Sequence, residues 1–206
     1  VEYPHFAPTG GFLKAVPTGD TDGWIMKFDN TRALIWSTYF GGSNQETIAS
    51  AVVDKNDNLI IVGSTNSTDL PTQSLGIGEY MDASHNGDFD IFMARFSSNS
   101  VKEYTTYFGG SGEERYITPN SPGVFDGGCA AYDGNLVITG PTKSANFPLF
   151  NSIPGNLYYY SQINKGTNTT QKDGFLAVFN QNLAQKFCTF WGGESDDHSH
   201  EIALSS

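Results

Sequence analysis

The sequence of 206 residues predicts an all-β protein that is built from a repeated unit. Aromatic residues make up 14% of the chain, and its 23 Gly and 9 Pro suit short strands joined by tight turns. One five-residue pattern, Thr-aromatic-aromatic-Gly-Gly, occurs at 38–42, 106–110 and 189–193. A segment that recurs at such intervals is the sequence signature of a repeat protein. Residues that the copies share are therefore expected to be framework, and function should lie in what differs between them.

A β-hairpin is predicted at each copy of the Gly-Gly pattern. The first strand of each hairpin lies at 22–28, 90–96 or 173–179, and each of these segments begins with Asp and ends with Phe. In the first segment Trp24 and Met26 alternate with Ile25 and Lys27, which is the period of a strand. Polar turn residues follow, and a second strand then leads into the Gly-Gly pattern.

A second hairpin is predicted between consecutive Gly-Gly patterns. Its strands lie at 48–54 and 59–63 in the first full unit, and at 129–132 and 136–140 in the next. The turn of the later hairpin is Asp-Gly-Asn, which is a strong turn signal. One unit therefore contains two hairpins, or four antiparallel strands.

Long insertions and incomplete units interrupt this regular pattern. Dissimilar insertions at about 73–87 and 149–172 separate the two hairpins of a unit, and loops this long are usually functional or disordered. Residues 11–19 are expected to form the second strand of an incomplete unit. Residues 200–204 are expected to form the first strand of another.

Tandem units of four short antiparallel strands are typical of β-propeller blades. The shared segments resemble the SBBP repeat, a bacterial β-propeller repeat family, and the matching segments are 22–28, 37–42, 58–63, 69–72, 90–110, 135–140, 146–148 and 173–193. The resemblance implies a propeller in a large secreted or surface-attached bacterial protein, and it implies little about chemistry.

Blade-like units are expected at about 11–47, 48–115 and 116–198, with the start of another at 199–206. Because a propeller closes with about four to eight blades, we expect these roughly three blades to be part of a longer propeller. The remainder of a longer chain, or a second copy, would complete the ring.

Composition restricts the partners. The net charge of −11 disfavours nucleic acid as a ligand, because it would repel the phosphate backbone. No stretch of about 18 apolar residues predicts a membrane span. Cys129 and Cys188 could pair or stay free. No nucleophile elbow, phosphate-binding loop or zinc motif is present, so an enzyme is not expected. No cofactor is expected either, although Ca²⁺ stays open.

Acidic residues after each Gly-Gly pattern form the first group of candidate site residues. The group comprises Glu46, Glu113, Glu114, Glu194, Asp196 and Asp197. Equivalent loops lie on one face of a propeller, so these carboxylates are expected to form a solvated acidic rim. Alternatively they converge to bind Ca²⁺, which takes about six to eight oxygen ligands.

Two further groups are weak metal candidates. Asp20 and Asp22 resemble the start of a calcium loop, but Thr31 stands where the loop requires its last Glu ligand. His198 and His200 lie beside acidic residues and would share one face of a strand, which suits zinc. Because Asp occurs at the equivalent position in all three units, it is expected to accept backbone hydrogen bonds instead.

The insertion that contains Tyr158, Tyr159 and Tyr160 is the best binding candidate that varies between units. Exposed tyrosines often bind sugars or proteins, although these rings could instead pack over the edge of a blade. The sequence thus predicts a non-enzymatic propeller module that binds a glycan or protein, serves adhesion or acts as a rigid scaffold. The alternative is a polysaccharide-active hydrolase or lyase that uses the acidic residues after the Gly-Gly patterns.

Overall fold

The computed structural model describes residues 4–115, 127–152, 155, 157–162, 171–197 and 199–203. Within this part every regular element is a β-strand, which confirms the predicted all-β class. None of the described residues forms a helix long and apolar enough to cross a membrane. The strands are β1 (Gly23–Phe28), β2 (Leu34–Phe40), β3 (Glu46–Val53), β4 (Leu59–Thr65), β5 (Asp90–Phe96), β6 (Lys102–Phe108), β7 (Gly128–Tyr132), β8 (Asn135–Thr142), β9 (Phe150–Asn151), β10 (Asp173–Phe179) and β11 (Gln185–Trp191).

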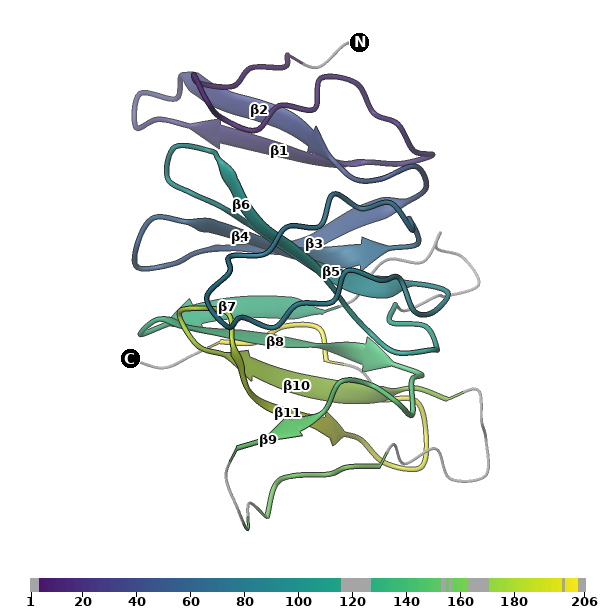
Figure 1. The fold of residues 1–206 in the computed structure, drawn as a ribbon. Helices are drawn as coiled ribbons and strands as arrows, with labels where there is room; N and C mark the ends of the chain where they lie inside the picture. The colour runs from purple at the N-terminus through teal and green to yellow at the C-terminus, as the bar shows by residue number, and fades with distance from the viewer. Residues whose placement is uncertain are drawn as a thin grey trace.

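The strands form three antiparallel sheets, which are stacked in Figure 1. The middle sheet has the order β3-β4-β5-β6, which is the predicted unit of two hairpins. The third sheet repeats this order as β7-β8-β10-β11 and adds β9 at its edge. The first sheet contains only the hairpin β1-β2, the counterpart of β5-β6 and β10-β11. This architecture is propeller-like, since the sheets pack face to face as propeller blades do.

The predicted hairpins share one irregular turn. In each, the register shifts at the last Phe of the first strand, at Phe28, Phe96 and Phe179. Four residues later the backbone is left-handed, at Arg32 (φ 69°), Ser100 (φ 63°) and Leu183 (φ 58°). Residues with side chains rarely adopt this conformation, so the three hairpins are constrained in the same way despite different sequences.

Two apolar clusters fill the spaces between the sheets. One lies between the first and middle sheets and includes Trp36, Phe40 and Phe96. The other lies between the middle and third sheets and includes Phe108 and Phe175. Because successive residues of a strand point to opposite faces, the middle sheet supplies side chains to both clusters. Cys129 and Cys188, for which the sequence left pairing open, are both free thiols.

The segments that join the hairpins run along the outside of the outer strands. Phe6 donates its N–H to Ser37 of β2, Gln73 donates to Thr105 of β6, and β9 pairs with Cys188 of β11. The predictions for both ends of the chain were wrong in part. Residues 11–19 form no strand, because they belong to such a segment beside β2, and residues 199–203 form no strand either.

Candidate functional site

The threonine of each Gly-Gly pattern holds in place the connecting segment that runs along the outside of its strand. Its hydroxyl accepts a backbone N–H from that segment, and the next residue of the pattern donates its own N–H to the same segment residue. The pairs are Thr38 with Lys14 at 2.8 Å, Thr106 with Asp82 at 2.8 Å and Thr189 with Tyr160 at 2.7 Å. Lys14, Asp82 and Tyr160 therefore occupy equivalent positions.

Two acidic residues flank the glycines in every copy. The second acid accepts the N–H of the second glycine: Gly42 donates to Glu46 at 2.8 Å, Gly110 to Glu114 at 3.2 Å and Gly193 to Asp197 at 2.5 Å. The first acid is Asp22, Asp90 or Asp173, the aspartate that opens each hairpin. A Cβ on Gly109 would lie 2.6 Å from Asp90 Oδ1 and 2.6 Å from Glu114 Oε2. Only glycine leaves room for both carboxylates, so the Gly-Gly pair is framework.

Burial controls the charge of the acids in the second copy. Glu114 is fully buried and accepts hydrogen bonds from Thr142 at 2.7 Å and Ser144 at 2.5 Å. Burial raises the pKa of Glu114 to about 7, against the opposing effect of these hydrogen bonds. Burial also raises the pKa of Asp90.

Glu113 differs from its neighbour because basic groups surround it. Its carboxylate pairs with Lys143 at 2.8 Å and with Arg115 at 2.9 Å. Burial pushes the pKa of Glu113 up, but the hydrogen bonds from Lys143 and Arg115 outweigh it, and the net pKa lies below its usual value. Glu113, Glu114 and Glu46 are all buried. The expectation of a solvated rim is therefore wrong for these residues, which brace the turn into the next sheet.

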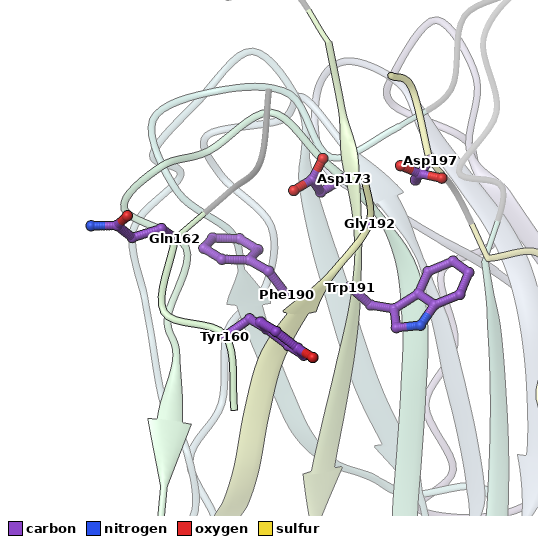
Figure 2. Close-up of a pocket in the computed structure, with 7 residues that line it drawn as sticks. All are labelled: Tyr160, Gln162, Asp173, Phe190, Trp191, Gly192 and Asp197. Carbon is purple, nitrogen blue, oxygen red and sulfur yellow. The ribbon is translucent and has the colours of Figure 1, made fainter. Parts of the chain in front are cut away.

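The third copy of the pattern differs, because a cavity of about 360 Å³ opens beside it. It is lined by Tyr160, Gln162, Asp173, Phe190, Trp191, Gly192 and Asp197. Figure 2 shows both carboxylates at the loop end of the strands, with the aromatic rings along the strands below them. The volume is near the lower end of the range of about 300–1,000 Å³ that is typical of ligand pockets.

The rim of this cavity is aromatic and exposed. Trp191 is 58% exposed, whereas Phe40 and Phe108, its counterparts in the other copies, are fully buried. Tyr160 is 56% exposed. The electrostatics and the shape of the third copy therefore allow it to hold a cationic or hydroxyl-bearing group between carboxylates and rings.

A comparison with known families agrees with this architecture. Residues 35–71 match the SBBP family, described as a beta-propeller repeat. The chain carries an SBBP repeat. The matched SBBP segment covers most of β2, the first Gly-Gly loop, β3 and β4, so it spans the junction between two sheets. No curated protein matches the chain. The resemblance noted in the sequence is thus confirmed for one copy, and the repeat indicates a propeller module.

The structure places the remaining candidate residues apart from one another. Asp196 is exposed and accepts the N–H of Lys172 at 2.8 Å, and Glu194 is also exposed. Asp22 pairs with Lys14 at 2.7 Å, as a structural acceptor would, while Asp20 and His200 are exposed. His198 lies outside the described residues. Among the described residues, no group of three or more His, Cys, Asp or Glu side chains could hold a metal ion.

Of the three tyrosines, the middle one packs on the sheet. The ring of Tyr159 lies 6.3 Å from that of Phe187, whereas Tyr158 and Tyr160 are mostly exposed. Asp173, Trp191 and Gln162 were not predicted from the sequence as lining residues. Trp191 could have been found, because it replaces Phe at one position of an otherwise shared pattern. Nothing in the sequence singled out Gln162.

Proposed function

We propose that the chain is a non-enzymatic β-propeller module of a secreted or cell-surface bacterial protein, and that it binds a glycan or protein ligand at the cavity beside β11. The observation that carries this proposal is the cavity with its exposed aromatic rim, at the one Gly-Gly loop where the framework is not sealed. Adhesion is the corresponding role at a cell surface. The location itself is supported by the repeat family alone.

Exposed aromatic side chains are the strongest sign of binding here. Leu157, Tyr158 and Trp191 each leave more than half of their surface in water, and Leu157 is 87% exposed. An exposed aromatic side chain beside a carboxylate, as Trp191 and Asp197 are in the cavity lining, is common at interaction sites. Tyr and Trp are also favoured in such sites because they add a large contact area and a polar tip.

A polysaccharide-active hydrolase or lyase is the second candidate. Asp173 and Asp197 line one cavity, as a pair of catalytic carboxylates would. The same pair recurs at Asp90 and Glu114, where both residues are fully buried, and Asp173 itself is only 1% exposed. Recurrence without access favours a framework role for the pair, and so a binding module over an enzyme. A module that only spaces other domains would need no such cavity.

The test compares binding of the wild type with that of a rim variant on glycan and protein arrays. The variant Tyr160→Ala/Trp191→Ala removes the rim, and Tyr132→Ala is the matched control, because Tyr132 is 50% exposed at the distant turn between β7 and β8. We expect a ligand that the control retains and the rim variant loses. Equal binding by both variants, or no ligand at all, would contradict the proposal. Release of sugar fragments from a bound glycan would establish the enzyme instead.

The location and the completion of the ring are tested separately. Antibodies against the chain should label intact cells of the source bacterium or precipitate the protein from its medium, and labelling only after lysis would contradict a surface role. Because propellers close with about four to eight blades, we propose that further repeats of a longer chain, or a second copy, complete the ring. The length of the parent polypeptide and the mass of the protein in solution distinguish these two arrangements.

A further inference from the structure

The β1 edge of the first sheet is open in the described part of the chain. β1 pairs with β2 on one side, and none of the described strands pairs with its other side. The counterparts of β1 are central strands, since β5 pairs with β4 and β6, and β10 pairs with β8 and β11. An edge strand presents backbone N–H and C=O groups to which another strand can pair. The middle and third sheets in Figure 1 therefore serve as templates for a strand that pairs with β1.

A hollow of about 480 Å³ lies beside this edge. The first sheet lines it with the end of β1, at Met26, Lys27 and Phe28. The middle sheet lines it with the end of the β3-β4 hairpin and with the β5–β6 turn, at Val53, Asp57, Leu59, Ser97 and Ser98. Val53 is 58% exposed. The hollow thus borders both the open edge and an apolar side chain that its own sheet leaves in water.

The junction of the middle and third sheets shows what covers the same positions. The counterparts of the five middle-sheet residues also line one space there, and they are Ala131, Gly134, Leu136, Asn180 and Gln181. That space has only about 10 Å³, because the β3-β4 hairpin forms its opposite wall with residues 54–56 and Ile60. Leu136 is 2% exposed, whereas Leu59 is only partly buried. An inner hairpin therefore fills this position where one is present.

The two strands that pair with the counterparts of β1 share a sequence pattern. β4 reads Leu-x-Ile-x-Gly-x-Thr, and β8 reads the same after its first residue. The glycine lies opposite an aromatic residue, in the pairs Gly63 with Phe92 and Gly140 with Phe175. A Cβ on Gly63 would lie 2.9 Å from the Phe92 ring, so the ring requires glycine there. Trp24 is the corresponding aromatic residue of β1, so a strand with this pattern fits opposite β1 as well.

We propose that the β1 edge and the hollow beside it bind a β-hairpin from a further repeat of the same polypeptide, outside residues 1–206, whose second strand reads Leu-x-Ile-x-Gly-x-Thr. Its Leu would lie opposite Phe28, as Leu59 lies opposite Phe96, and its turn would cover Val53. This inference rests on the proposed completion of the ring and names the segment that completes it at this end. A second copy of the chain is not the donor, because the hairpins of this kind among the described residues are already paired, β4 with β5 and β8 with β10.

The test supplies such a hairpin at the distance that the template defines. Phe6 and Gln73 are equivalent, because each exchanges two backbone hydrogen bonds with the residue before its pattern threonine. A second copy of residues 46–67, which contain β3 and β4, is therefore joined directly to Val1. It then precedes Phe6 by as many residues as the original precedes Gln73. The readout is hydrogen exchange of the β1 amides that point away from β2, measured by nuclear magnetic resonance.

We expect these amides to exchange at least about tenfold more slowly in the extended protein than in the original chain. The matched control carries Ile60→Lys and Val62→Lys in the added copy only, because both side chains are buried against the next sheet in the template. The control should leave the exchange within about twofold of the original chain, since burying two unpaired charges is costly. Equal exchange in the extended protein and in its control would overturn the inference.

A second measurement uses the original chain and a free peptide of residues 46–67. We expect the peptide to bind, and Val53→Asp to weaken binding at least about tenfold by placing a charge in the hollow. Val16→Asp is the matched control, because Val16 is 69% exposed and does not line the hollow, and it should stay within about twofold of wild type. Peptide binding that both variants retain equally would refute the assignment of the hollow.

Two outcomes separate this inference from the other occupant and from the proposed ligand. If the original chain dimerises in sedimentation experiments and the dimer protects the β1 amides, a second copy occupies the edge and the inference fails. The cavity beside β11 lies in the third sheet, so rim-dependent binding of an array ligand can stand when the hairpin inference fails. Loss of that binding function would in turn leave the exchange of the β1 amides unchanged.

Discussion

Replacement of Glu114 by Gln should change how the stability of the protein depends on pH. Glu114 lies at the junction of the middle and third sheets, fully buried beside Asp90, and burial raises its pKa from 4.5 to about 7. Between these values the folded protein keeps the proton on Glu114, while the unfolded chain releases it. The free energy of unfolding therefore falls as the pH rises from about 4.5 to about 7, because the folded state binds more protons.

The magnitude follows from the size of the shift. Each pKa unit corresponds to about 1.4 kcal/mol, so a rise from 4.5 to about 7 costs the folded protein about 3 kcal/mol by pH 8. The variant has no proton to lose at this position. Its stability relative to wild type should therefore improve by about 3 kcal/mol between pH 5 and pH 8. Any constant offset at pH 5 reports the altered hydrogen bonds of the amide.

The assay is urea unfolding of both proteins at several pH values from 5 to 8. Glu113→Gln is the matched control, because Glu113 is adjacent and buried but has a pKa below its usual value. Its contribution to stability is present above about pH 4.5 and is lost as the pH falls through its lowered pKa, so the control should keep the wild-type slope between pH 5 and 8. Parallel curves for wild type and Glu114→Gln would refute the reasoning.

Four other substitutions test the framework role of the Gly-Gly pattern. Gly109→Ala should destabilise the protein by about 1–3 kcal/mol, because its Cβ has no room between the two carboxylates. Gly193→Ala should be tolerated, because the nearest atom to its Cβ would be 3.6 Å away. Equal melting temperatures of the two variants would contradict this prediction. Thr106→Val should cost about 1–3 kcal/mol in urea unfolding, because the N–H of Asp82 loses its acceptor, and no loss would show that water replaces it. Tyr107→Phe should also lower the free energy of unfolding by about 1–3 kcal/mol, since the buried hydroxyl accepts the N–H of Leu70 at 2.9 Å and donates to the carbonyl of Ser67 at 2.7 Å. An unchanged melting temperature in calorimetry would argue against both hydrogen bonds.

The hairpins could be predicted because their signals are local. Alternation with a period of two, polar turn residues and the recurring Asp and Phe fixed the strands β1, β5 and β10 to within a residue. The two-hairpin unit followed from the same signals and is the middle sheet. The left-handed turn residues were not predicted, because Arg32, Ser100 and Leu183 carry no composition signal for that conformation.

The candidate site could be predicted only in part. The tyrosine insertion stays a predicted binding segment, and the burial of Glu46 and Glu114 was not foreseen. An acid in a loop is usually solvated, and only the stacking of the next sheet shows that these loops lie inside a junction. The equivalence of Tyr160 and Lys14 was also hidden. Lys14 lies 24 residues before its threonine and Tyr160 lies 29 before its own, so constant spacing could not reveal the match.

The sequence by itself determined the all-β class, the repeat, the hairpins and the glycines that the loops require, because side-chain alternation and turn chemistry act between residues that are close along the chain. The tertiary structure decided which acids are buried, which segment crosses each outer strand and where the cavity lies. These properties depend on how one sheet packs on the next. That is why, of three copies of one pattern, the third has a cavity beside it at Gly192, whereas the aromatic residues Phe40 and Phe108 of the other two are buried.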